Sequence, residues 1–356
     1  MKQQANEKNR LTKRIQRKIS KVWKNNAIQR WISEYKKYGS LWNYRHGFYK
    51  ETMELSGITK SNYTNFLDDR RYEAGHPYNR AFSSIIDNKI YLPYLLKDYP
   101  DYAPQYYYFI NRGRVLSMNK MYNDGFQSFL DLLDEKKKLV IKQCYWSFGK
   151  GFYLIEMGEE KDRFLINKVD SSLKQLQRLV RILCDCVCTE YVQQHEYSAN
   201  VCSTSVNTIR FLCVRDEESG FFYLARCLHR FGVEGSIVDN LGGGGRAYLF
   251  FVDIESGTLK ENGMYALGEE ECYSAHVEYP DNKAYMGMVI PRFEEVKNKV
   301  IEISNSFPFL RYIGWDVAIT NDGFKILEAN SLTSLSILQR EGGYLEDEKL
   351  RKFFLK

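Results

Sequence analysis

Hydrophobic positions near the N-terminus follow a helical period. Apolar residues recur every three or four positions from Leu11 to Tyr35, while basic side chains fill the opposite side. This pattern predicts a basic amphipathic helix that is broken near Asn25 and Asn26. From about 41 to 88 the chain is aromatic and polar and shows no strand alternation, so we expect short helices and loops there.

Beyond residue 86 the pattern changes to short apolar runs separated by turn residues. We predict helices over about 122–136, 171–183 and 292–305 from their helical spacing. The apolar runs predict strands over 106–110, 139–142, 152–156, 184–192, 206–215, 221–228, 247–253, 314–320 and 324–329. Asn321-Asp322-Gly323 joins the last two strands and is typical of a tight hairpin turn. This order of elements predicts an α+β fold.

Composition is that of an ordinary globular protein. The chain has 356 residues, of which 44% are hydrophobic and 27% charged, which excludes collagen-like, disordered and low-complexity classes. At about 150 residues per domain, two or three structural units are expected. No run approaches the roughly 18 apolar residues of a membrane span, and the first residues lack the apolar core of a secretory signal. We therefore expect a cytoplasmic protein.

Basic charge is concentrated at the N-terminus. Residues 1–50 contain 14 Lys and Arg against two acids, while the remaining residues contain 37 bases and 43 acids. Tryptophans on the apolar side of the predicted helix and lysines on the other side suit an anionic membrane surface, which would make the protein peripheral at the inner membrane face. The alternative is a helix that packs on the protein's own body. No nucleic-acid-binding motif accompanies the charge, so nucleic acid is not an expected partner.

The eight cysteines are too sparse for a disulfide scaffold and lie mostly in apolar runs. In the closest group, Cys184, Cys186 and Cys188, a period of two places all three sulfurs on one face of a strand. This spacing favours buried thiols over a zinc site.

The last predicted hairpin carries the first candidate chemistry. Asp316 lies within an otherwise apolar strand, and Glu328 and Asn330 lie on one face of the partner strand because alternate residues point the same way. Three oxygen donors on adjacent strands suit Mg²⁺ that also holds phosphate oxygens. An edge hairpin with acids in solvent is the alternative, but it explains less well why the neighbouring residues are apolar.

Two further groups could bind a nucleotide. Lys142 ends a predicted strand and precedes the turn Ser147-Phe-Gly149-Lys-Gly151, so an ammonium group and backbone N–H groups could meet a polyphosphate. In Thr189-Glu190-Tyr191-Val192, Glu190 and the following backbone could pair with adenine, and Glu196 could accept ribose hydroxyls. Taken alone, each group also fits an ordinary turn or a strand that ends at the surface.

The order and spacing of these groups resemble the ATP-grasp superfamily. Lys142 is followed by an acidic segment at Glu190 and, near the C-terminus, by Asp316 and Glu328-Ala-Asn330. Three more segments are similar to the sugar-transfer-associated ATP-grasp branch, which is found with polysaccharide biosynthesis genes: Val206-Asn-Thr-Ile-Arg210, Val238-Asp-Asn-Leu-Gly-Gly-Gly-Gly245 and Ile313-Gly-Trp-Asp316. The resemblance covers about residues 80–345. It implies an ATP-grasp fold, in which two α+β subdomains clasp ATP, preceded here by a helical basic N-terminal region.

The resemblance also implies roles for particular residues. Those implied to bind ATP are Lys89, Lys142, Ser147, Gly149, Gly151, Glu190, Tyr191, Val192 and Glu196. The implied Mg²⁺ ligands are Asp316, Glu328 and Asn330, and the implied catalytic residues at the acyl phosphate and reacting carboxylate are Arg210, Arg226 and Asn240. The implied organisation is an N-terminal region over 1–80, a linker with the first subdomain over 81–195, and the second subdomain over 196–356.

The implied reaction is ATP-dependent ligation of a carboxylate to an amine through an acyl phosphate, with ATP and Mg²⁺ as cofactors. A glycan-precursor uronic acid and an amino acid are the substrates that the branch suggests. Two alternatives remain open: a kinase of a sugar or lipid-linked acceptor, and a nucleotide-binding adaptor of a glycosyltransferase complex without turnover. The chain departs from the family's usual pattern at Gln143, where proline normally follows the lysine, and in its glycine-poor turn.

Overall fold

A computed structural model describes residues 27–145, 151–160, 162–239, 246–261, 263–268, 273–274, 285 and 287–356. The chain divides into two compact units. One, here called the helical unit, comprises Met1–Ala74 and Leu335–Gly343, and the other, the two-sheet unit, comprises Gly75–Ser334 and Tyr344–Lys356. The predicted helix before Ala27 and the residues Ser147, Gly149 and Asn240 lie outside the described residues.

The helical unit consists of short helices joined by turns, as its aromatic and polar sequence predicts. Its elements are α2 (Ala27–Tyr38), α3 (Leu41–His46), α4 (Lys50–Ser56), η1 (Tyr63–Asn65), α5 (Asp69–Gly75, whose last residue belongs to the two-sheet unit) and α12 (Leu335–Leu338). Buried Asp69 accepts hydrogen bonds from the Thr52 hydroxyl at 2.6 Å and the Tyr49 backbone N–H at 2.7 Å. Gln339 exchanges two hydrogen bonds with the backbone of Leu67, which ties the C-terminal segment to the N-terminal helices.

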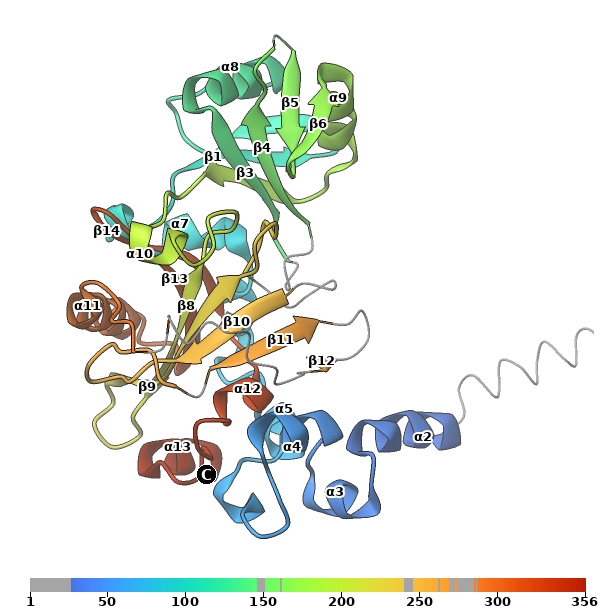
Figure 1. Cartoon of the computed structure of the whole chain (residues 1–356), viewed down its shortest axis with the longest axis vertical. Helices are drawn as coiled ribbons and strands as arrows, with labels where there is room; N and C mark the ends of the chain where they lie inside the picture. The colour runs from blue at the N-terminus through green and yellow to red at the C-terminus, as the bar shows by residue number, and fades with distance from the viewer. Residues whose placement is uncertain are drawn as a thin grey trace, which may run out of the picture. The chain divides into compact units, whose positions relative to one another are not determined.

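The two-sheet unit contains two antiparallel sheets, which confirms the predicted α+β class (Figure 1). Sheet A has the order β2-β1-β7-β3-β4-β5-β6, with β1 (Tyr106–Asn111), β2 (Arg114–Ser117), β3 (Lys138–Gln143), β4 (Phe152–Met157), β5 (Arg163–Ile166), β6 (Val169–Ser172) and β7 (Cys186–Glu190). Sheet B has the order β12-β11-β10-β9-β8-β13-β14, with β8 (Thr208–Arg215), β9 (Phe222–Gly232), β10 (Arg246–Phe251), β11 (Met264–Gly268), β12 (Tyr273–Ser274), β13 (Tyr312–Thr320) and β14 (Gly323–Asn330).

Short strands account for most differences from the predicted elements. We did not predict β2, β5, β6, β11 and β12, which have two to five residues each and are too short for a clear alternation. The helix expected from residue 171 begins at Leu173, because the Ser172 side chain caps it and Gln175 completes a capping box. The hairpin at Asn321-Asp322 forms as predicted, with Thr320 paired to Gly323.

Sheet A is covered on one face by two helices, α8 (Phe126–Lys136) and α9 (Leu173–Ile182). Their apolar sides share one core with alternate residues of β1, β3, β4 and β7. Cys186 and Cys188 lie in this core, at 1% and 0% exposure, so the prediction of buried thiols is confirmed for them. Because side chains alternate along a strand, Val140, Lys142 and Leu154 point to the opposite face.

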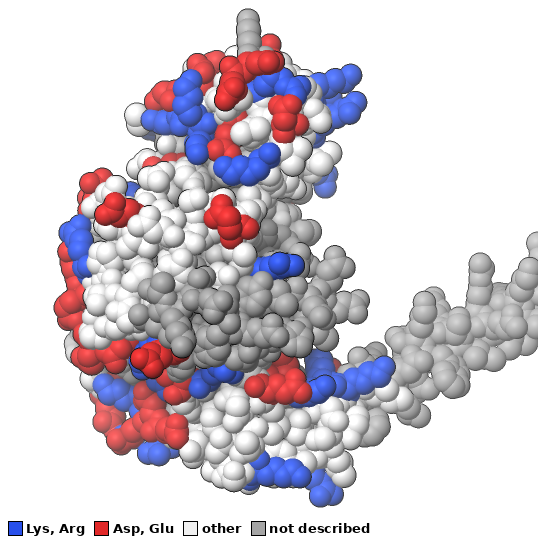
Figure 2. Space-filling view, viewed as in Figure 1, with Lys and Arg blue, Asp and Glu red and all other residues white. Residues whose placement is uncertain are grey.

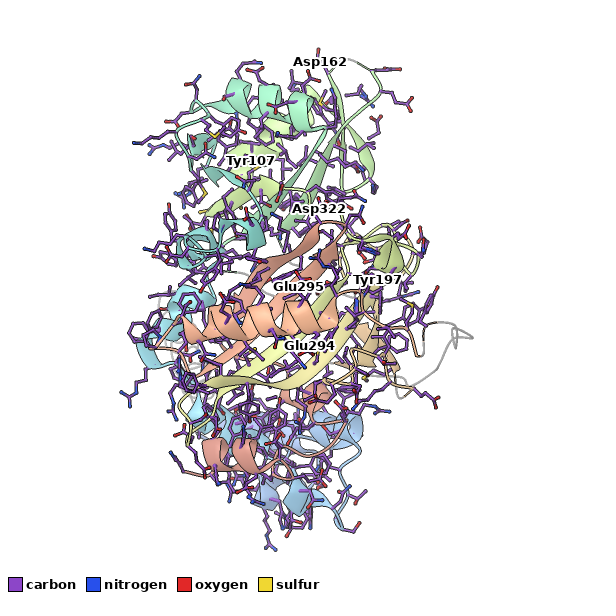
Figure 3. The ribbon with its side chains drawn as sticks, turned by 90° about the vertical axis from the view of Figure 1, so that its left-hand side faces the viewer. Tyr107, Asp162, Tyr197, Glu294, Glu295 and Asp322 are labelled. Carbon is purple, nitrogen blue, oxygen red and sulfur yellow. The ribbon has the colours of Figure 1, made fainter. Side chains whose placement is uncertain are left out.

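Sheet B is covered on one face by α11 (Phe293–Asn305), as Figure 3 shows with Glu294 and Glu295 on the first turn of that helix. Trp315 is fully buried beneath it and donates a hydrogen bond from Nε1 to the Ser304 hydroxyl at 2.9 Å. Thr208, Arg210 and Asp316 alternate with residues of this core, so they lie on the other face of the sheet.

Short helices link the sheets and end the chain. They are η2 (Arg80–Phe82), α6 (Ser83–Ile86), η3 (Lys89–Tyr91), α7 (Leu92–Leu95), η4 (Pro100–Tyr102), α10 (Glu196–Ala199) and α13 (Glu348–Phe354). Among the residues that the structure describes, no helix has the length and hydrophobicity needed to cross a membrane.

Candidate functional site

A pocket in the two-sheet unit is lined by the helix-free faces of both sheets. Sheet A contributes side chains from β3, β4 and the end of β7, and sheet B contributes β8, β9, β13 and β14. The lining residues are Pro104, Val140, Lys142, Phe152, Leu154, Glu190, Tyr191, Val192, Val206, Thr208, Arg230, Ile237, Val238, Asp239, Asp316, Leu327 and Glu328. The pocket is therefore mainly apolar on the side of sheet A, apart from Lys142 and Glu190, and strongly charged on the side of sheet B.

Lys142 brings a single cation to the apolar side. Its neighbours on the same face, Val140 and Leu154, give it an apolar setting. Burial lowers the pKa of Lys142 to about 8, an effect that Glu328 opposes and Lys89 reinforces. A buried lysine interacts more strongly with an anion than an exposed one does, because little water screens its charge.

The end of β7 supplies the second part of the pocket. Glu190, Tyr191 and Val192, the segment predicted to bind adenine, all line the pocket. The Glu190 carboxylate accepts a hydrogen bond from the Gln105 backbone N–H at 3.1 Å, and Lys138 lies over the Tyr191 ring at 5.4 Å. Glu196, the predicted ribose ligand, is exposed in the first turn of α10 and is not among the lining residues described.

Asp316 lies between two arginines on the face of sheet B. Arg210 pairs with both carboxylate oxygens through Nε and Nη2, the latter at 3.0 Å from Oδ2. Nη2 of Arg230 lies 2.9 Å from the same Oδ2. Burial by itself raises the pKa of Asp316, but the two guanidinium groups outweigh it and lower the pKa to about 2. Asp316 is therefore ionised at any physiological pH.

Glu328 and Asn330 lie beside Asp316, as predicted from their alternation. Glu328 is the cross-strand partner of Asp316, and Asn330 is the partner of Gly314. The Glu328 carboxylate accepts a hydrogen bond from buried Lys89 Nζ at 3.0 Å. The Asn330 amide nitrogen donates to the Gly314 carbonyl at 3.3 Å, so its oxygen is the atom that it can offer to a cation.

Three polar residues that line the pocket were not predicted as site residues: Arg230, Thr208 and Asp239. Thr208 faces Arg230 across β8 and β9, and its hydroxyl accepts hydrogen bonds from Nη2 of Arg230 at 2.5 Å and from Nε at 3.2 Å. Thr208 donates from its backbone N–H to Asp239 at 2.8 Å and also from its hydroxyl. A charged residue within the apolar sequence of β9 could have marked Arg230 as a site residue, but Arg226 has the same setting, so the sequence does not distinguish the two.

Arg226 lies on the same face of β9 as Arg230, four residues away, but has other partners. Its Nη1 is 3.4 Å from Asp347 Oδ2, and its guanidinium lies 5.5 Å from the centre of the Tyr344 ring. Leu228, at 4% exposure, is buried between the two arginines along the strand. The structure thus brings Arg210 to Asp316 but does not bring Arg226 there.

Of the predicted phosphate-binding turn from Ser147 to Gly151, the structure describes only Gly151. Its carbonyl accepts a hydrogen bond from the Gln143 backbone N–H at 3.0 Å, and its φ of +70° is one that glycine adopts easily.

The residues present fit a nucleotide with magnesium. Glu328 and Asn330 offer oxygen ligands beside Asp316, and Lys89 and Lys142 offer cations to phosphate oxygens. Among the described residues no group of three His, Cys, Asp or Glu side chains forms a metal site of its own. A cation here would therefore need oxygens from Asn330 and a phosphate as well.

These features are those of an ATP-grasp protein. The sequence model of the family described as sugar-transfer associated ATP-grasp matches residues 69–350, about four-fifths of the chain. The chain belongs to this family and has its ATP-grasp fold. No curated protein sequence matches it significantly.

Three solved structures resemble the chain at low identity. The ATP-grasp ligase PsnB with its minimal precursor has 13% identity and a TM-score of 0.35, with 74% of this chain and 57% of that chain covered. For an N5-carboxyaminoimidazole ribonucleotide synthetase (purK) with ADP the values are 11%, 0.37, 71% and 46%. For D-alanine–D-alanine ligase from Bacillus anthracis they are 13%, 0.38, 77% and 68%. The chain thus spans only about half the length of the first two, and likenesses of this size carry no argument about activity.

Proposed function

We propose that the protein is an ATP-dependent carboxylate–amine ligase. In the first step a carboxylate oxygen attacks the γ-phosphorus of ATP, the bond to the β-phosphate oxygen breaks, and ADP and an acyl phosphate form. An amine then attacks the acyl carbon, phosphate leaves with the electrons of the C–O bond, and the amine loses a proton to give the amide. Activation is needed because a carboxylate is a poor electrophile until its oxygen becomes part of a leaving group.

The arrangement of cations around Asp316 and Glu328 carries this proposal. Arg210 holds Asp316 through Nε and Nη2, and Arg230 holds it through Nη2 while its Nε donates to Thr208. Within the described part of the chain neither Nη1 group has a hydrogen-bond partner, so each arginine has donors left for a phosphoryl oxygen. A phosphoryl group in transfer carries charge on its equatorial oxygens, and fixed cations stabilise that charge without reorganisation.

The other end of the pocket supports ATP as the phosphoryl donor. Val140, Leu154 and Val192 give apolar walls for a flat ring, and the backbone after Glu190 can pair with its edge. Lys142 and Glu328 line the same pocket, and the charge of Glu328 raises the pKa of Lys142 against the effect of burial. A nucleotide with its base at Val192 would therefore direct its phosphates toward the arginines.

Bound Mg²⁺ would neutralise the phosphate oxygens and align them for transfer. Asp316, Glu328 and Asn330 are the residues that we propose to hold it. We also propose Ser147, Gly149, Gly151 and Lys89 at the phosphates, Glu196 at the ribose, and Asn240 at the reacting carboxylate, as the family resemblance implies.

For the substrates, we propose a glycan-precursor uronic acid and an amino acid, in either assignment of carboxylate and amine. This choice rests on the sugar-transfer association of the family.

Product analysis tests the proposal. We would incubate the protein with Mg-ATP and a panel of uronic acids, sugar nucleotides and amino acids, and measure ADP and phosphate release together with product mass. A ligase needs carboxylate and amine together and gives a product lighter than their sum by one water. A product heavier than one acceptor by a phosphoryl group would instead identify a kinase, and ATP binding without any turnover would identify an adaptor.

We also propose that the N-terminal region binds an anionic membrane surface. The basic excess of the chain lies in residues 1–50, which carry 14 bases and two acids. On the face shown in Figure 2, Lys and Arg are mixed with Asp and Glu over the described residues, so this surface gives no comparable excess of one sign. A segment rich in Lys and Arg gains about 1 kcal/mol per basic residue near an anionic surface.

A further inference from the structure

We propose that Thr208 and Asp239 are positioning residues that aim the guanidinium group of Arg230 at the transferred phosphoryl group. The inference rests on the proposed phosphoryl transfer and adds two residues whose action runs through Arg230. Neither residue is needed to touch substrate for this role.

The contacts form one continuous chain through the buried part of the site. Asp239 accepts from Thr208, Thr208 accepts from Arg230, and Arg230 donates to Asp316, which Arg210 holds from its other side. Thr208 is 4% and Asp239 8% exposed, so little water replaces these bonds if one is lost. Apart from the uncharged Thr208, acids and bases alternate along this series of contacts, so the position of each charged group depends on its neighbours.

The hydroxyl of Thr208 has only one proton, and its position decides the role of this side chain. Because the hydroxyl donates to Asp239, its lone pairs are left for Arg230. The carboxylate of Asp239 therefore fixes the hydroxyl, and the hydroxyl fixes the Nε and Nη2 side of Arg230. Asp239 also attracts Arg230 directly, at 3.6 Å from Nε.

Arg210 shows why Arg230 needs this support. Arg210 meets Asp316 in a two-pronged pair through Nε and Nη2, a geometry that fixes a planar guanidinium by itself. Arg230 reaches Asp316 only through Nη2. A single contact leaves the group free to turn about it, and Thr208 with Asp239 supplies the second point of attachment.

Four variants test the proposal: Thr208→Val, Thr208→Ser, Asp239→Asn and Arg230→Gln. Two readouts are used, kcat for ADP formation and the ratio of MgATP to MgADP affinity by calorimetry, since Arg230 is aimed at the group that only ATP carries. We expect Thr208→Val and Asp239→Asn to lower kcat by about tenfold or more and to reduce the affinity ratio, because small misplacements of a catalytic group are costly. Thr208→Ser keeps the hydroxyl and should stay within about twofold of the wild type.

A double-mutant cycle separates positioning from a structural role. If Thr208 acts through Arg230, adding Thr208→Val to Arg230→Gln lowers kcat no further. The proposal is overturned if Thr208→Val keeps the wild-type kcat and affinity ratio, or if its effect is the same size in the Arg230→Gln background. Ser304→Ala is the matched control, since it removes a fully buried hydroxyl on the opposite face of sheet B and should lower stability but not kcat.

Failure of the ligase proposal would look different. If no acyl phosphate forms, hydroxylamine traps no hydroxamate in the wild type. The ratio of ATP to ADP affinity can still be measured in all variants and needs no acceptor. If Asp239→Asn does not fold, the comparison of Thr208→Val with Thr208→Ser still decides whether the hydroxyl positions Arg230.

Discussion

Removing the carboxylate of Asp316 should lower the stability of the two-sheet unit and abolish turnover. The side chains of Arg210 and Arg230 are only 13% and 14% exposed, and Asp316 is the shared acceptor of both. Asp316→Ala therefore leaves two buried cations without their common partner. Breaking a buried pair in this way costs about 3–5 kcal/mol. For a unit of this size that corresponds to a fall in Tm of roughly 6–20 °C.

An exposed pair of the same geometry is the control. At the start of α11, Arg292, the N-cap residue, donates from Nε and Nη2 to the two oxygens of Glu295, both at 2.8 Å, with side chains 45% and 56% exposed. Exposed pairs contribute only about 0–1 kcal/mol. Glu295→Ala should therefore lower Tm by less than about 4 °C in the same calorimetric scan. Equal shifts in the two variants would refute the reasoning that burial makes the Asp316 pairs strong.

The pH dependence of the unfolding free energy gives an independent check of how much the ionised Asp316 carboxylate stabilises the protein. The folded pKa of Asp316 is lowered to about 2 from an ordinary value of 3.8. A lowered folded pKa means that the contribution to stability is full above the unfolded pKa and is lost as the pH falls through the folded one. The difference in unfolding free energy between wild type and Asp316→Ala should thus be constant near neutral pH and shrink between about pH 4 and pH 2.

Three further predictions concern Lys142, Arg226 and the N-terminus. Burial lowers the pKa of Lys142 to about 8, so its ammonium form should be lost as the pH rises through about 8, and kcat/KM for ATP should fall with it. Lys142→Arg should remove this fall from the pH profile. An unchanged fall in that variant would contradict the assignment to Lys142. Arg226→Gln breaks the contacts with Asp347 and Tyr344, so it should lower Tm while kcat stays within about twofold; a loss of kcat with unchanged Tm would restore its catalytic role. Flotation with anionic vesicles should be lost when six basic residues become glutamine, namely Lys13, Arg14, Arg17, Lys18, Lys21 and Lys24. Undiminished flotation would refute membrane binding.

The hairpin that carries Asp316 could be predicted because its determinants are local. The turn Asn321-Asp322-Gly323 fixes which residues face each other, and alternation fixes which face they share. From Thr320 opposite Gly323 this register runs back to Val317 opposite Ile326, and continued regularly it would place Leu327 opposite Asp316. The bulge between Asp316 and Val317, which no local pattern predicts, shifts the register by one residue and brings Glu328 opposite Asp316.

The partners of Asp316 could not be predicted in the same way. Arg210 and Arg230 come from β8 and β9, and Asp239 lies 31 residues from Thr208 in sequence. Such contacts depend on the order of strands in sheet B, which no local pattern encodes. Charged residues in apolar strands do signal buried pairs, but the signal does not say which acid each base will meet.

The two arginines of β9 show the limit of what strand alternation can predict. Arg226 and Arg230 are separated by four residues, so alternation places both on the same face, and the sequence gives no reason to prefer one. Four residues of strand are about 13 Å, however, which is more than the reach of a guanidinium group. Sheet order puts Arg230 beside Asp316, and the returning C-terminal segment puts Asp347 and Tyr344 over Arg226. The same face of one strand thus holds a candidate catalytic cation at one end and a cation that binds the chain's own C-terminal segment at the other, and only the three-dimensional arrangement distinguishes them.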